Sequence, residues 1–219
     1  MSGERELWGK VTRMLGSGEK ELGSHWTYNL WNDPKRLGFV LSRYKFAAKM
    51  AARERRVLEL GCSEGIGAPI LAEQAASYTG IDIDEPAIEA ARRNWSGERL
   101  EFLVGDFLDK PVGGFDAVVS LDVVEHVQPD SAHLFFDAIA ANLDGDGVAV
   151  VGTPNATSEQ YASEASRRGH VNLYEASRLK ESMGRLFHNV FMFGINDEIV
   201  HTGFAPMAHY LVAVGCYAR

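Results

Sequence analysis

Short apolar runs alternate with helical patterns between residues 55 and 152, and this alternation constrains the fold more than any other feature of the sequence. Brief runs rich in β-branched residues and bounded by turn residues predict buried strands. Helical segments between such strands predict a parallel sheet with helices on both faces, which is an α/β fold. The expected strands are 56–60, 78–82, 100–106, 115–121 and 148–152, and the expected helices are 66–76, 86–95 and 129–143.

The sequence changes character beyond this region. A polar segment, 153–174, contains no apolar strand pattern, and we expect a helix over 175–187. Two further strands, 188–195 and 209–218, are joined by a connection that is too long for a tight hairpin. A loop of this length in a compact domain usually has a functional role.

Composition and charge limit the class of protein. The chain has 219 residues, of which 46% are hydrophobic and 24% charged, as in one globular domain. Residues 1–50 are polar and then rich in aromatic side chains, so we expect an N-terminal helical cap there. Two cysteines exclude a disulfide framework, and no apolar run is long enough for a signal peptide or a membrane span, so we expect a cytoplasmic protein. The net charge of −8 disfavours nucleic acid as a partner.

Residues at three successive strand ends carry the strongest chemical signal. The turn ELGCSEGIG (59–67) follows the first strand, and its glycines let a ligand approach the backbone. Asp82 ends the second strand, where a carboxylate can bind ribose hydroxyls, and Asp84 is the better candidate for capping the next helix. Asp106 and Phe107 follow the third strand, where an acid and an aromatic ring can bind adenine. Because carboxyl ends of parallel strands meet in one crevice, these groups predict one nucleotide-like ligand.

The segments VLELGCSEGIG, GIDID, VGD, FDAVVSLDVVEHV and LDGDGVAVVGTPN, in this order, resemble the class I S-adenosylmethionine-dependent methyltransferases. The resemblance runs from about residue 40 to the C-terminus. It implies a Rossmann-like, doubly wound sheet of seven strands, mostly parallel with an antiparallel last strand, and an S-adenosylmethionine-binding domain over 51–219. An NAD-dependent oxidoreductase is disfavoured, because Gly61, Gly65 and Gly67 do not follow the G-x-G-x-x-G spacing.

The resemblance also implies which residues bind the cofactor. The glycine-rich turn would line its methionine end, Asp82 its ribose, and Asp106 with Phe107 its adenine. Ser63 stands where the family often has glycine, and a requirement for positive φ there would count against it. The implied set is Glu59, Gly61, Cys62, Ser63, Gly65, Asp82, Ile83, Asp106, Phe107, Leu121 and Arg43.

A second cluster, Asp122-Val-Val-Glu125-His126, follows the fourth strand, where this fold places the reacting methyl group. His126 is a candidate general base. Together with His170, the pattern resembles the ubiquinone-pathway O-methyltransferases and the small-RNA 2′-O-methyltransferases. That resemblance implies a divalent metal, Mg²⁺, Mn²⁺ or Zn²⁺, held by Asp122, Glu125, His126 and His170, which would help a hydroxyl lose its proton. In the alternative interpretation there is no metal: Glu125 caps or forms an ion pair, and His126 only lines the site.

Recognition of the acceptor must come from segments outside the core. Residues 24–45 combine aromatic side chains with Arg36 and Arg43, either of which could pair with the cofactor carboxylate or an anionic substrate. The alternative is a cover helix with buried aromatic rings and solvated cations. The loop 196–209 is the second candidate segment, and His25 follows no pattern, so we interpret it as structural.

We therefore expect methyl transfer from S-adenosylmethionine to a small-molecule acceptor, most readily to a hydroxyl oxygen of a sugar, a quinone precursor or a natural product. RNA 2′-O-methylation is an alternative, which the scarcity of basic clusters disfavours. A non-catalytic subunit with the same fold is another, and the complete set of site acids disfavours it. The edge strands and the aromatic N-terminus are compatible with a homodimer.

Overall fold

The apolar strand patterns combine into a single sheet with the strand order β3-β2-β1-β4-β5-β8-β6-β7. The computed structural model describes residues 2–15 and 19–219. Neighbouring strands from β3 to β5 are parallel, whereas β8 runs antiparallel to both β5 and β6. The strands are β1 (Arg56–Leu60), β2 (Ser77–Asp82), β3 (Leu100–Val104), β4 (Phe115–Leu121), β5 (Leu143–Pro154), β6 (Phe187–Asn196), β7 (Ile199–His201) and β8 (Tyr210–Ala218).

The predicted Rossmann-like sheet is confirmed, with one strand more than the seven expected. The additional strand, β7, lies inside the predicted loop 196–209 and pairs antiparallel with the end of β6. Sequence patterning missed it because a three-residue strand is too short to show alternation. The predicted strand 100–106 ends earlier, at Val104, so that Asp106 and Phe107 lie beyond the sheet.

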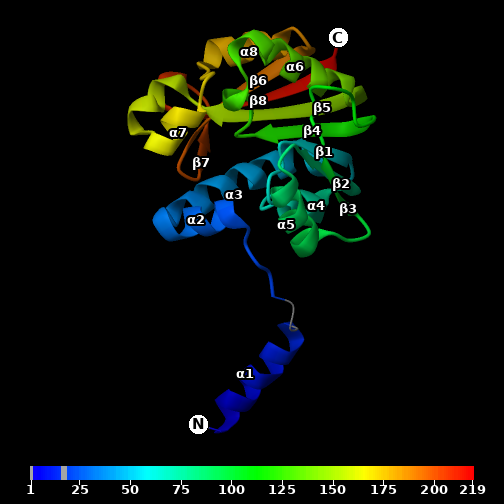
Figure 1. Cartoon of the computed structure of the whole chain (residues 1–219), viewed down its shortest axis with the longest axis vertical. Coiled ribbons are helices and arrows are strands. Elements are labelled where there is room, and N and C mark those ends of the chain that lie inside the picture. The colour runs from blue at the N-terminus through cyan, green and yellow to red at the C-terminus, as the bar shows by residue number, and fades with distance from the viewer. Residues whose placement is uncertain (1, 16–18) are drawn as a thin grey trace.

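Helices cover both faces of the sheet (Figure 1). Successive strand residues point to opposite faces, so Val57 packs in the core beneath α3 and α4, and Leu58 packs in the core beneath α6 and α8. The helices are α1 (Ser2–Leu15), α2 (Ser24–Asn32), α3 (Lys35–Ala47), α4 (Ala68–Gln74), α5 (Glu85–Trp95), α6 (Ala132–Ala141), α7 (Glu164–Gly169) and α8 (Ala176–Gly184). Short helical turns are η1 (Ala48–Ala52), η2 (Val124–His126), η3 (Pro129–Ser131), η4 (Ala156–Tyr161) and η5 (Ala205–Met207).

The start of α5 shows how local sequence sets an element boundary. Asp84 Oδ1 accepts a hydrogen bond from the Ala87 N–H at 3.3 Å, which confirms it as the helix cap. Pro86 occupies the first turn, where its missing N–H costs nothing. The cap leaves Asp82 on the opposite side of the turn, at the end of β2.

The N-terminal segment contributes three helices. Of the predicted cap 1–50, residues 1 and 16–18 lie outside the described residues. α2 and α3 pack on the sheet through Trp26, Val40 and Tyr44, all buried, while α1 lies apart from the layers in Figure 1. In the described part of the chain, no helix is both long and apolar enough to cross a membrane.

Candidate active site

A cavity of about 560 Å³ opens at the carboxyl ends of the parallel strands. The ends of β1, β2, β3 and β4 contribute to its wall, as expected for a crevice at the edge of an open α/β sheet. The predicted residues that line it are Gly61, Cys62, Ser63, Asp82, Ile83, Asp106, Phe107, Leu121, Asp122, Glu125, His126 and His170. The fold therefore brings together residues that are spread over more than a hundred positions of the sequence.

The turn after β1 is held tightly against its surroundings. Gly61 has φ +78°, and a Cβ there would lie 2.3 Å from Cγ2 of Val123, so only glycine fits. Ser63 also has positive φ, +48°, a region that non-glycine residues rarely adopt. Its N–H donates to Oδ2 of Asp82 at 2.8 Å, which offsets part of the strain and links the turn to the end of β2.

The side chains expected to bind adenosine are oriented by the backbone. Asp82 Oδ1 accepts from the Asp84 N–H at 2.9 Å, and Asp106 Oδ1 accepts from the Leu108 N–H at 2.8 Å. Ile83 is 68% exposed on the rim, whereas Phe107 is buried below it. Each carboxylate therefore has a fixed direction and retains free acceptor capacity.

Glu59 has a different place from the one expected. Glu59 is not one of the described residues that line the cavity. Its carboxyl is fully buried between Tyr44 and Tyr78, and the hydroxyls of both tyrosines donate hydrogen bonds to it. Burial raises the pKa of Glu59 to about 7. Gly65, also missing from that wall, has φ +69° and packs against Trp95. Both residues support the turn on the side away from the cavity, and their contact with a cofactor stays a prediction.

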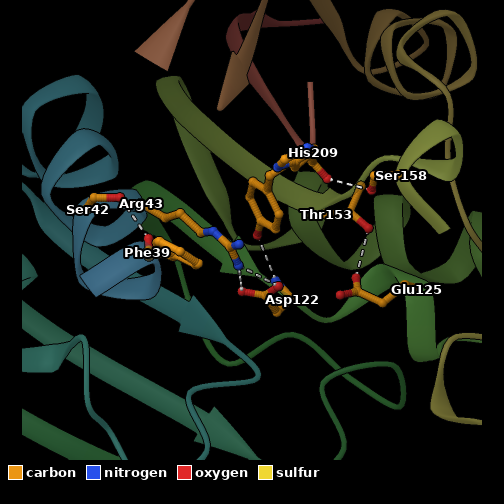
Figure 2. A network of polar contacts seen from close by, with 9 residues as sticks. Phe39, Ser42, Arg43, Asp122, Glu125, Thr153, Ser158 and His209 are labelled. Carbon is orange, nitrogen blue, oxygen red and sulfur yellow. Dashed lines mark hydrogen bonds and ion pairs between the residues drawn. The ribbon is translucent and has the colours of Figure 1, made fainter. Parts of the chain in front are cut away.

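Arg43 and Asp122 are engaged with each other. Arg43 reaches from α3, and its Nη1 donates to both carboxylate oxygens of Asp122 at 3.0 Å (Figure 2). The guanidinium also lies over the ring of Tyr210 at 3.7 Å, and the Asp122 N–H donates to the Tyr210 hydroxyl at 3.1 Å. Asp122 has φ +58°, so strained backbone is retained at this point of the cavity. Arg43 lines a second cavity rather than the first, which leaves Arg36 as the arginine on the main cavity wall.

Beyond Asp122, one carboxyl and two imidazoles converge. Potential ligand atoms of Glu125, His126 and His170 lie within 4.8 Å of one another. The Thr153 hydroxyl donates to Oε2 of Glu125 at 2.9 Å, as Figure 2 shows, and burial together with Asp122 raises the pKa of Glu125. Within residues 2–15 and 19–219, Oε1 of Glu125 is buried without a hydrogen-bond partner. Three of the four residues implied to hold a metal thus lie together, whereas Asp122 is paired with Arg43, and metal binding by this set stays a prediction.

The two histidines are oriented differently from each other. Nδ1 of His126 lies 2.9 Å from the Gly169 carbonyl, which identifies Nδ1 as the protonated nitrogen and leaves Nε2 as an acceptor. The His126 and His170 rings meet edge to face at 5.1 Å. Burial lowers the pKa of His170, and His126 adds to this effect, so His170 is a neutral base at neutral pH.

A second cavity of about 400 Å³ adjoins the first. The two share Arg36, Asp122 and His170, so these residues mark the junction. The second cavity lies between α3, the segment from η4 to α7, and the β6–β7 turn. Its charged residues beyond the junction include Asp33, Lys35, Glu159, Arg167 and Asp197.

The N-terminal cap supplies wall residues from the candidate recognition segment 24–45, within which the sequence left aromatic lid and plain cover helix open. His25 and Trp26 from α2 and Tyr44 from α3 line the main cavity. His25, interpreted as structural from the sequence, lies close enough to Asp122 and His126 for their charges to affect its pKa, which burial lowers. The aromatic content of residues 24–45 was the only signal for this wall, and it also fitted a plain cover helix.

The structure is an α/β protein with a crevice at its strand ends and an adjoining chamber lined by charged and apolar side chains. A family model described as "Methyltransferase domain" matches residues 33–186, so the chain belongs to this family. The predicted resemblance to class I S-adenosylmethionine-dependent methyltransferases is thereby confirmed.

Individual relatives agree with this family. A fatty-acid O-methyltransferase of Mycolicibacterium smegmatis is 38% identical over 93 residues, which cover 41% of this chain and 31% of that protein. A ubiquinone biosynthesis O-methyltransferase of Vibrio campbellii is 28% identical over 139 residues, covering 55% of this chain and 57% of that protein. The matches with these curated relatives thus span from about a third to little more than half of their length.

The fold itself is shared with solved structures. The N-methyltransferase NodS of Bradyrhizobium japonicum, in complex with S-adenosyl-l-homocysteine, has a TM-score of 0.61 and 19% sequence identity. The similarity covers 87% of this chain and 91% of that chain.

Proposed function

We propose that this chain transfers the methyl group of S-adenosylmethionine to a hydroxyl oxygen of a small, polar acceptor. The observation that carries the proposal is the continuity of the site. The wall formed by Asp82, Phe107 and Leu121 leads directly to His126 and His170, and His170 also lines the second cavity. A donor in the first cavity and an acceptor in the second would therefore meet beside neutral imidazole.

The cofactor-binding residues fit an adenosyl ligand. Asp82 is directed by the Ser63 and Asp84 N–H groups and would accept hydrogen bonds from the ribose, while Asp106 and Phe107 would bind the adenine. Arg36 is the cation on the same wall, and we assign to it the pairing with the cofactor carboxylate. Arg43, the other candidate, is neutralised by Asp122.

The chemistry asked of the protein is modest. When bound, S-adenosylmethionine supplies a methyl group already activated on a sulfonium centre. The residues must place the acceptor oxygen in line with it and accept the hydroxyl proton. His170 lies at the junction of the two cavities, so its imidazole is the proposed proton acceptor. The Gly169 carbonyl holds His126, which packs against His170 and fixes its position.

One observation favours assistance by a divalent cation. Oε1 of Glu125 is a buried oxygen that has no hydrogen-bond donor among the described residues. Burying such an oxygen costs free energy unless a partner such as a cation binds it. Glu125, His126 and His170 are the residues that would hold Mg²⁺, Mn²⁺ or Zn²⁺. A bound cation would occupy the His170 lone pair, so its Lewis acidity, which lowers the pKa of an acceptor hydroxyl, would then replace His170 as the means of activating the acceptor.

The second cavity favours a polar acceptor over a fatty chain. Beside apolar residues such as Phe39 and Leu173, its walls carry charged side chains of both signs, among them Asp33, Lys35 and Arg167. Burying hydrocarbon against such groups would remove their water without replacing its hydrogen bonds. A sugar-like or otherwise polyhydroxylated molecule satisfies them instead, so we place the acceptor in that class.

Calorimetric titration with S-adenosylhomocysteine tests the proposal directly. We expect S-adenosylhomocysteine to bind with micromolar affinity, and the binding isotherm should be the same when EDTA is present. In a separate titration without EDTA, added Mn²⁺ or Zn²⁺ should bind with release of protons. This metal binding should be lost in a Glu125→Gln variant. If the wild-type protein binds no S-adenosylhomocysteine, the proposed activity is wrong and a non-catalytic role is favoured.

A further inference from the structure

A carboxylate in the cofactor turn caps a helix of the N-terminal segment. Oε1 of Glu64 accepts from the His25 N–H at 2.8 Å, and Oε2 accepts from the Trp26 N–H at 3.0 Å. Glu64 itself is only 5% exposed. One side chain therefore satisfies two of the N–H groups that every helix leaves unpaired at its start.

The helix is built to receive this long-range cap. Its own N-cap residue is Gly23, which has no side chain to offer, and α2 has no acidic residue in its first turn. A Cβ at Gly23 would lie 2.2 Å from the Glu64 carboxyl, so glycine leaves room for it. The negative charge of Glu64 also lies at the positive end of the helix dipole, where it is stabilising.

The turn that carries Glu64 and the start of α2 both line one cavity. Glu64 belongs to the turn between Gly61 and Gly67, which is expected to contact the cofactor. The residues whose N–H groups it accepts, His25 and Trp26, both line the same cavity from α2. Two hydrogen bonds of ordinary length therefore join the cofactor turn directly to α2.

We propose that Glu64 is a positioning residue that latches α2 to the cofactor-binding turn, so that cofactor binding and the placement of His25 and Trp26 over the site are coupled. This inference rests on the proposed function, because it takes S-adenosylmethionine as the occupant of the cavity. Since thermodynamic linkage is reciprocal, loss of the Glu64 hydrogen bonds lowers the affinity for the cofactor, and cofactor binding stabilises the docked position of α2.

A purely structural cap would have a different signature. Removing such a cap would lower the free energy of unfolding, but the ligand would still slow amide exchange in α2 to the same extent. The latch predicts that ligand-dependent protection of α2 is lost together with Glu64. A helix cap of ordinary strength corresponds to a factor of roughly 2 to 30 in the docking equilibrium of α2.

The test compares Glu64→Ala, Glu64→Gln and a control, Glu73→Ala, which removes an exposed acid from α4. Amide hydrogen exchange of His25 and Trp26 is followed by NMR with and without S-adenosylhomocysteine, and affinity is measured by calorimetry. In the wild-type protein and the control, ligand should slow exchange at both amides. In Glu64→Ala, both amides should exchange about 10-fold faster and ligand affinity should fall by a similar factor.

Glu64→Gln keeps one carbonyl acceptor and replaces the other oxygen by an NH₂ group. It should therefore restore protection at one of the two amides, show intermediate affinity, and melt between the wild type and Glu64→Ala when followed by circular dichroism. Equal affinity and equal protection in the wild type and Glu64→Ala would overturn the latch while leaving the methyltransferase proposal standing. Failure of the wild type itself to bind S-adenosylhomocysteine would instead overturn the proposed function.

Discussion

The buried carboxyl of Glu59 makes folding stability depend on pH in a way that one substitution should remove. In the folded protein, burial raises the pKa of Glu59 from 4.5 to about 7. The folded state therefore holds this proton up to about pH 7, whereas the unfolded chain releases it near pH 4.5. Since the folded state binds more protons across this window, stability falls as the pH rises through it.

The size of the effect follows from the two pKa values. Their difference corresponds to about 3 kcal/mol of unfolding free energy, lost between about pH 4.5 and pH 7 and constant above that. Glu59→Gln has nearly the same shape and does not titrate, and the hydroxyls of Tyr44 and Tyr78 can still pair with the amide. The variant should therefore gain about 3 kcal/mol relative to the wild type between pH 4.5 and pH 8.

Urea unfolding followed by circular dichroism at several pH values measures this difference. Other titrating groups affect both proteins equally and cancel in the comparison. Glu73→Gln, at an exposed position on α4, serves as the control and should track the wild type at every pH. If the stability difference between Glu59→Gln and the wild type stays constant within about 1 kcal/mol from pH 4.5 to 8, the reasoning about burial is refuted.

Three further outcomes are expected. Asp82→Ala should weaken S-adenosylhomocysteine binding by roughly 1–3 kcal/mol in calorimetry, the cost of unpaired polar groups, and unchanged affinity would contradict the ribose assignment. Gly67→Ala places a Cβ 2.1 Å from the ring of Tyr44, so urea unfolding should show a loss of about 1–3 kcal/mol from overpacking; wild-type stability would mean that α3 yields at this contact. His170→Ala should keep cofactor binding and lose methyl transfer once an acceptor is found, and persistent turnover would assign proton removal to another group.

Local sequence rules predicted the elements that depend on local chemistry. Asp84 and Pro86 marked the start of α5, and the apolar runs marked seven of the eight strands, because caps and strand patterns are properties of neighbouring residues. The edge strand β7 was not predicted, because it forms by pairing with β6 and its three residues show no strand pattern of their own. The class of ligand was also predictable, since the fold dictates that the strand ends meet.

Long-range pairing of side chains was not predictable. Arg43 and Asp122 are 79 positions apart, and each alone was a reasonable ligand for something else. Glu59 and the glycine turn are neighbours in sequence, yet Glu59 turns away from the cavity toward Tyr44 and Tyr78. Whether a polar group faces a ligand or a partner depends on packing across the sheet, which a single sequence does not encode locally.

The cap is fastened to the sheet at three acids: Glu64 holds α2, Glu59 holds Tyr44, and Asp122 holds Arg43. A shortened chain beginning at residue 51 would remove every one of these donors, leaving Glu59 with Tyr78 alone, and unpaired carboxyls are costly when they are buried or half-buried. Cap and sheet should therefore melt in one cooperative transition. In the divergence of this family, a cap with a new acceptor preference could be exchanged only together with the acids that anchor it, so the two segments are expected to evolve as one inherited unit.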